Sequence, residues 1–172
     1  MIEDKVILVD NNDNQIGLMP KLEAHEKGVL HRAFSVFIFN NDGELMLQRR
    51  ALTKYHSPGL WTNTCCSHQR DGETNIISGK RRLNEEMGFD TELFEKTSFI
   101  YKAKFDNGLT EHEFDHVLVG CYNHSPMINS TEVDSWKWMS MENIKKDIKD
   151  HPDNYTAWFK IIFEKYYKYI SQ

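Results

Sequence analysis

Two short segments carry residues whose types and spacing suit proton transfer and metal binding. The first, residues 61–68, reads Trp-Thr-Asn-Thr-Cys-Cys-Ser-His and places the Cys66 thiol two residues before the His68 imidazole. The second supplies Glu111 and Glu113, which an extended strand points to the same side, with His112 facing away. Thiols, imidazoles and carboxylates exchange protons and bind metals. We therefore expect the two segments to share one pocket.

The composition indicates one soluble domain. A chain of 172 residues is long enough for one substantial core, and its net charge of −5 argues against nonspecific nucleic-acid binding. Its three cysteines include the adjacent Cys65 and Cys66, which are poorly placed to bridge each other, so a reducing cytoplasm fits best. The N-terminus lacks a secretory pattern, and no segment approaches the roughly 18 apolar residues of a membrane span. We expect a single cytoplasmic domain, residues 1–172, with no nucleic-acid or membrane partner.

Alternation and turn signals predict a strand-rich chain. Strongly turn-forming segments, such as residues 41–43 and 106–108, separate runs of β-branched and aromatic residues. The predicted strands are 5–9, 15–19, 31–39, 44–49, 60–66, 98–105, 111–122 and 135–139.

Three helices are expected among these strands. Residues 75–87 have Thr74 as N-cap and Gly88 as a left-handed end, although Gly79 weakens the pattern. Ser140 can cap a second helix, and residues 155–170 show the three-to-four-residue apolar spacing of a third. Mixed strands interleaved with helices predict an α+β fold or a layered α/β/α sandwich.

Residues 67–89 resemble a Nudix box, a loop-helix-loop that holds divalent metal beside a diphosphate. The family pattern is Gly-x5-Glu-x7-Arg-Glu-U-x-Glu-Glu-x-Gly-U, where U is apolar. The matching residues are Glu73, Arg81, Leu83, Glu85, Glu86, Gly88 and Phe89. Ser67 replaces the first glycine, and Arg82 replaces a metal-binding glutamate. A cation thus stands where Nudix hydrolases carry a carboxylate.

The Arg82 replacement, the cysteine segment and the Glu-x-Glu pair together resemble type I isopentenyl-diphosphate delta-isomerase. The resemblance spans nearly the whole chain, and it also includes the 31–35 strand and the Arg-Arg-Ala run at 49–51. It implies a Nudix-like α/β/α sandwich with a mixed sheet. It also implies an isomerase that interconverts isopentenyl and dimethylallyl diphosphate, for isoprenoid precursor biosynthesis, through a carbocation-like state.

A set of nitrogen and oxygen donors is suited to a divalent metal such as Mn²⁺, Mg²⁺ or Zn²⁺. For a single histidine, an ordinary packed or hydrogen-bonded role is the more common one, and spacing alone does not decide. The resemblance assigns five metal ligands, namely His25, His31, His68, Glu111 and Glu113. It gives no such support to His56, His112, His116, His124 or His151.

The resemblance also assigns the catalytic groups. Moving a double bond requires an acid and a base on opposite sides of the substrate. Cys66 and Glu113 take these roles, and Tyr101 positions the Glu113 proton. Trp158, together with Trp61 as a weaker candidate, excludes water and faces the developing positive charge. Cys65 and Cys121 are expected to be ordinary packing residues.

The diphosphate end of the substrate requires cations. The resemblance assigns this role to Lys21, Arg50, Lys54 and Arg82, with Trp158 completing the substrate pocket. Glu86 and the backbone carbonyl of Cys66 would hold a second, substrate-associated Mg²⁺. The alternative role for Arg82 and Glu86 is a simple ion pair with each other. We expect a monomer that binds a small prenyl diphosphate; a Nudix diphosphate hydrolase is the rival, and a noncatalytic binding module is a third alternative.

Overall fold

The computed structural model describes residues 4–171, so residues 1–3 and 172 of the predicted single domain lie outside the described part. The strands are β1 (Lys5–Val9), β2 (Gln15–Pro20), β3 (His31–Phe39), β4 (Glu44–Arg50), β5 (Trp61–Thr62), β6 (Cys65–Ser67), β7 (Leu93–Lys104), β8 (Thr110–Cys121) and β9 (Val133–Ser140). The helices are α1 (Lys21–Lys27), α2 (Asn75–Met87), α3 (Met141–Asp150), a 3-10 turn (Pro152–Asn154) and α4 (Ala157–Ile170).

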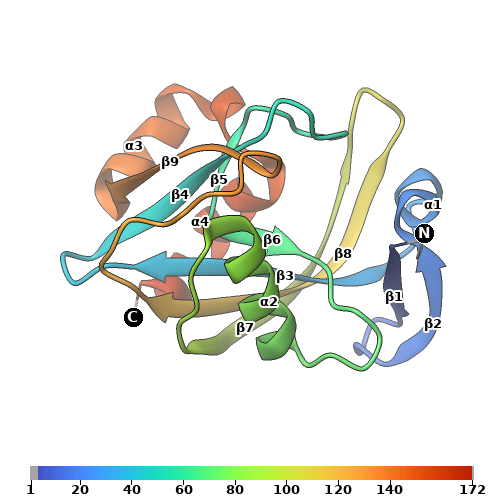
Figure 1. The fold of residues 1–172 in the computed structure, drawn as a ribbon. Helices are drawn as coiled ribbons and strands as arrows, with labels where there is room; N and C mark the ends of the chain where they lie inside the picture. Colours follow the sequence, from blue (N-terminus) through green and yellow to red (C-terminus); the bar gives the residue numbers. More distant parts are fainter. Residues whose placement is uncertain (1–3, 172) are drawn as a thin grey trace.

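A mixed sheet is organised around β3 (Figure 1). Strand β3 pairs in parallel with β8 over nine residues, and it pairs antiparallel with β1, β4 and β6. Strand β7 forms a long antiparallel hairpin with β8, and β4 carries β9 and β5. The predicted 41–43 turn does join β3 to β4, but these strands pair only at Phe39 and Leu45 before they diverge.

Helices cover both faces of the sheet, as a layered sandwich requires. Alternate residues of β3 point to opposite faces, so Phe34 and Val36 pack toward Leu83 and Met87 of α2. On the other face, Phe37 packs into a core that contains much of α4. In Figure 1, α2 lies in front of the central strands, whereas α3 and α4 lie behind them. The α/β/α sandwich with a mixed sheet is confirmed.

Helix α2 has the predicted bounds, and its ends are the predicted ones. The Thr74 side chain accepts from the Ile77 N–H, and Gly88 takes a left-handed conformation with φ 74°. Gly79 permits close packing, because a Cβ there would lie 2.6 Å from Leu118 Cδ1 and 3.1 Å from Leu93 Cδ1, and these buried side chains would have to shift. The glycine that weakens the helical pattern therefore lets the helix approach the sheet.

The prediction of one strand over 60–66 is wrong. The segment forms β5 and β6, which pair with different neighbours, β4 and β3. Between them, Asn63 donates to the Val36 carbonyl, and Thr64 donates to the Met46 carbonyl and accepts from the Ile38 N–H. These side chains fill the gap where β3 and β4 diverge, so they replace the backbone bonds that a continuous strand would make.

Other boundaries shift, and one helix was not predicted. Strand β7 begins five residues before the predicted position 98, and α4 begins after the 3-10 turn rather than at 155. The seven-residue α1 is too short to show a helical apolar period, but it lies between Pro20 and Gly28, the latter left-handed with φ 64°. This helix carries Lys21 and His25 toward the sheet.

Gly79→Ala should destabilise the protein even though alanine favours helix. Alanine returns about 1 kcal/mol of helix propensity, but overpacking a core costs about 1–3 kcal/mol, so we expect a lower free energy of unfolding. Urea denaturation measures the change. Asn84→Ala, at an exposed site of the same helix, should be neutral or stabilising. A Gly79→Ala protein more stable than wild type would contradict the close-packing explanation.

Candidate active site

A cleft with an empty volume of about 490 Å³ opens where α1, β6, α2, β8 and α4 converge. It brings together residues that are distant in sequence, and it includes all of the predicted catalytic and substrate-binding residues. Those lining it are Lys21, Ser35, Arg50, Lys54, Tyr55, His56, Cys66, Ser67, His68, Arg82, Glu86, Tyr101, Glu111, Glu113 and Trp158.

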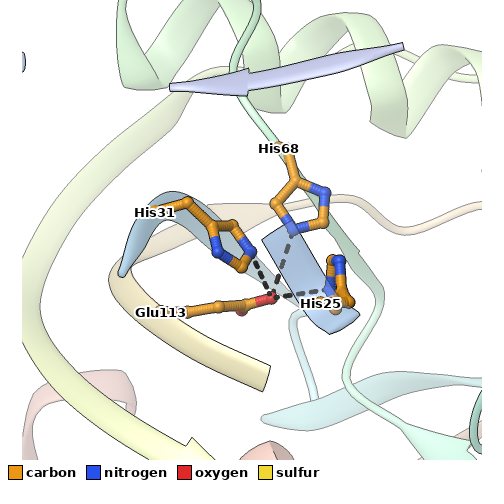
Figure 2. A group of neighbouring side chains, drawn as sticks. All are labelled: His25, His31, His68 and Glu113. Carbon is orange, nitrogen blue, oxygen red and sulfur yellow. Dashed lines mark hydrogen bonds and ion pairs between the residues drawn. The ribbon is translucent and has the colours of Figure 1, made fainter. Parts of the chain in front are cut away.

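Three imidazoles converge on one carboxylate oxygen beside this cleft (Figure 2). Glu113 Oε1 lies 3.9, 3.4 and 3.1 Å from the Nε2 atoms of His25, His31 and His68, respectively. The parallel pairing of β3 with β8 sets His31 directly opposite Glu113. The four side chains offer donor atoms within 4.8 Å of one another.

The hydrogen bonds of these rings leave lone pairs that face a negative charge. His25 Nδ1 lies 2.7 Å from the Lys21 carbonyl and His31 Nδ1 lies 2.8 Å from the Val29 carbonyl, so each Nδ1 carries the proton. Both Nε2 atoms are then unprotonated, and both are buried without a hydrogen-bond partner. A carboxylate oxygen and two nitrogen lone pairs repel one another unless a cation lies among them. The residues present therefore fit a divalent metal.

Burial favours the neutral form of His25 and His68. Desolvation lowers the pKa of His25, and it lowers the pKa of His68 to about 3. Neutral imidazole is the form that binds metal.

Tyr101 links the two glutamates of β8. Its hydroxyl lies 2.6 Å from Glu111 Oε2 and 3.0 Å from Glu113 Oε2, so it donates to either carboxylate. Burial raises the pKa of Glu111, and the Glu113 charge adds to this effect. Burial also opposes ionisation of Glu113, but the adjacent His31 and His68 imidazoles outweigh it and hold the pKa of Glu113 low. The pair thus combines an easily protonated carboxyl with a carboxylate that stays ionised.

The Cys66 thiol is held by two hydrogen bonds. Its S–H donates to Asn63 Oδ1 at 3.1 Å, and the Trp158 indole N–H donates to the sulfur at 3.0 Å. Burial raises the pKa of Cys66 to about 12, so the group is a protonated thiol near neutral pH. Cys65 packs in the core beneath α2, and Cys121 is exposed.

The predicted diphosphate-binding cations gather at the same cleft, and they have spare donors. Arg50 Nε and Arg82 Nε are buried without a hydrogen-bond partner among the described residues. Other Arg82 donors bind Glu85 at 2.7 Å and Glu86 at 2.6 Å, so the ion pair expected as the alternative to ligand binding is present. The Lys54 ammonium pairs with Glu132. These cations are therefore only partly neutralised by the protein.

The two tryptophans proposed for the pocket differ. Trp158 is buried, and Arg50 Cζ lies 5.3 Å from its ring centroid. Trp61 contacts the Lys137 ammonium at 4.1 Å instead, and within the described chain it is not one of the residues that line the cleft.

Sequence reasoning missed one histidine at the centre. His56 received no special role, yet its Nε2 lies 3.3 Å from Glu111 Oε1, and the two form a second possible donor group with His25. It lies in an irregular segment without a strand register that would place it. His112 faces away as expected, with its Nδ1 3.1 Å from the Gly28 carbonyl.

Comparison with known proteins decides the family. The NUDIX domain family matches residues 29–159. The chain is 48% identical over 164 residues to "Isopentenyl-diphosphate Delta-isomerase 2" of Aromatoleum aromaticum, covering 95% of this chain and 87% of that protein. It is 50% identical over 161 residues to the protein of the same name in Photorhabdus laumondii, covering 94% and 91%. The chain belongs to the isopentenyl-diphosphate delta-isomerase family.

Solved structures extend the match to the wider Nudix fold. A crystal structure of DR0079 from Deinococcus radiodurans has a TM-score of 0.77 at 17% identity and covers 95% of this chain and 99% of that one. The MutT protein of Methanosarcina mazei has a TM-score of 0.67 at 18% identity, with 81% and 94% covered. Within the described residues, none of the helices has the length and apolar character needed to cross a membrane.

Both the family of this chain and its buried residues fit a divalent metal site. Nudix enzymes use divalent metals, and this chain has the buried His/Glu group for one. Its Nudix box keeps the loop anchored, because Arg81 binds both Glu73 oxygens and also donates to the His68 carbonyl.

His68→Ala and Glu111→Ala should each lower bound divalent metal, because each removes a donor from the proposed shell. We expect roughly a 10–100-fold weaker affinity, measured by chelator competition and elemental analysis. His151→Ala, at an exposed site, is the control. Wild-type metal content in either cleft variant would remove that residue from the ligand set.

Proposed function

We propose that the chain interconverts isopentenyl diphosphate and dimethylallyl diphosphate by proton addition and removal, as a step in isoprenoid precursor biosynthesis. The observation that carries this proposal is the cleft itself. It combines a protonated thiol, a tyrosine-linked carboxylate and a group of cations within one partly enclosed space. The names of the relatives agree with this chemistry.

The catalytic pair would be Cys66 and Glu113. A proton is added to the terminal alkene carbon, a tertiary cation-like state forms, and a different proton leaves the neighbouring CH₂, which shifts the double bond. One group supplies the first proton and the other accepts the second, and the reverse reaction exchanges their roles. The Trp158 N–H remains able to donate to sulfur after the thiol loses its proton, and Tyr101 does the same for Glu113.

Exclusion of water protects the cation-like state. Trp158 and Tyr101 are nearly fully buried where they border the cleft, so they limit access to the reacting carbons. We propose that the Trp158 ring also faces the developing charge, an interaction of roughly 2 kcal/mol when desolvated. Its nearby Arg50 would then be drawn toward the diphosphate.

Lys21, Arg50, Lys54 and Arg82 would bind the diphosphate and hold the alkene between acid and base. Burial lowers the pKa of Lys21, and a bound anion would oppose that effect. Glu86 and the Cys66 carbonyl would hold a substrate-associated Mg²⁺, which neutralises phosphate charge. Because Arg82 pairs with Glu86 in this structure, substrate binding would give both groups new partners.

His25, His31, His68, Glu111 and Glu113 would hold one resident metal ion. A dication held by these residues would offset the negative charge of Glu111 and Glu113. Three imidazoles in the set favour Mn²⁺ or Zn²⁺ over Mg²⁺. We also propose a monomer in the cytoplasm, and the three free cysteines fit a reducing compartment.

The decisive experiment incubates purified protein with isopentenyl diphosphate and Mg²⁺, then separates the two isomers and measures phosphate. Formation of dimethylallyl diphosphate without phosphate release supports the proposal. Vigorous phosphate release would support the hydrolase instead, and binding without turnover would support a noncatalytic module.

Cys66→Ser and Cys66→Ala should retain fold and metal but lose isomerisation. An alcohol is a much poorer proton donor or base than a thiol, and a methyl group cannot transfer a proton. We expect a fall of roughly 10²–10⁴-fold in turnover. Isomer formation and metal content are measured together, with Cys121→Ser as the exposed control. Near wild-type turnover in both Cys66 variants would exclude the thiol from the mechanism.

Arg82→Glu restores the carboxylate of the Nudix pattern while it removes a proposed diphosphate contact. We expect weaker isomerisation without efficient hydrolysis, because hydrolysis also needs a water aligned with phosphorus. The matched control is Glu85→Gln, which removes an Arg82 partner but keeps the guanidinium. Rapid phosphate release by Arg82→Glu would show that this single residue separates the two activities.

A further inference from the structure

His56 lies in the loop between β4 and β5 and contacts Glu111, one of the proposed metal ligands. Its Nε2 lies 3.3 Å from Glu111 Oε1, while the other Glu111 oxygen accepts from Tyr101 at 2.6 Å. A ring nitrogen of His56 therefore faces one oxygen of this carboxylate, and the Tyr101 hydroxyl donates to the other. These two contacts restrict how Glu111 can turn.

Aromatic neighbours hold the His56 ring in place. Phe105 stacks on it with a centroid distance of 5.3 Å and an interplanar angle of 11°. Trp158 and Tyr55 meet it edge-on at 5.8 and 4.6 Å. A ring fixed on several sides directs its N–H without further loss of side-chain freedom.

The hydrogen bonding of His56 distinguishes it from His25 and His31, two of the three histidines of the proposed donor set. In His25 and His31, a backbone carbonyl binds Nδ1, which fixes the proton there and frees Nε2 for a metal. In His56, Nδ1 is buried without a partner among residues 4–171. A proton on that nitrogen would be an unsatisfied buried donor, whereas a proton on Nε2 has Glu111 as its acceptor.

We propose that His56 is a positioning residue for the metal centre, acting through an Nε2–H hydrogen bond that fixes the orientation of Glu111. This inference rests on the proposed metal site of the isomerase. Direct metal ligation by His56 is the competing arrangement, because its Nε2 lies within 4.8 Å of donor atoms of His25 and Glu111.

The test compares His56→Ala, His56→Gln and wild type in the full-length protein. A glutamine amide can donate a hydrogen bond to Glu111, but it is a poor substitute for imidazole as a ligand of Zn²⁺ or Mn²⁺. The affinity for Zn²⁺ and for Mn²⁺ is measured by chelator competition, beside kcat and KM. His124→Ala, at an exposed site outside the cleft, is the control.

We expect His56→Ala to weaken metal binding roughly 10–100-fold and His56→Gln to recover most of that loss. KM for substrate at saturating metal should change little, because His56 is not assigned to the diphosphate. Equal losses in both variants would overturn positioning in favour of ligation, and unchanged affinity in both would overturn any role at the metal. If wild type itself fails to bind a divalent ion, the metal site of the proposed function is wrong, which is a separate outcome.

Discussion

The register of β8 between β3 and β7 is the constraint on which the site depends. It sets Glu113 beside His31 on one side and Tyr101 on the other. Because alternate residues of a strand face opposite sides, a slip by one residue would turn Glu111 and Glu113 away from the cleft. The same register places Val117 and Val119 in the core beneath α4, so the burial of apolar side chains enforces the position of the carboxylates.

Buried carboxyl groups are tolerated here because they have hydrogen-bond partners and form, with the histidines, a group that could hold a metal ion. Glu111 and Glu113 are almost inaccessible to solvent, and an isolated ionised carboxylate in such a place is costly. Tyr101 and His68 offset part of this cost through hydrogen bonds. The remaining charge explains why a dication suits the site better than a further protein side chain would.

Much of this arrangement is predictable from sequence, because it depends on local patterns. The caps of α2 and the strand alternation placed most elements, and family motifs assigned the residues that the structure brings together in the cleft. Three features are set by tertiary contacts instead. Helix α1 is too short for a periodic signal, the break at Asn63 depends on the divergence of β3 and β4, and His56 comes from an irregular loop. Sequence spacing alone carries no signal for any of them.

The break at Asn63 shows how the core and the site are coupled. Its amide donates to the carbonyls of Val36 and Cys65, which secures the gap between strands, and its oxygen accepts the Cys66 S–H. A continuous strand through 60–66 would satisfy its backbone from neighbouring strands and leave no side-chain oxygen fixed beside the thiol. The irregularity that a simple strand prediction misses therefore orients the sulfur toward the cleft. The neighbouring Thr64 hydroxyl accepts from the Ile38 N–H and donates to the Met46 carbonyl, which links β3 to β4 where they diverge.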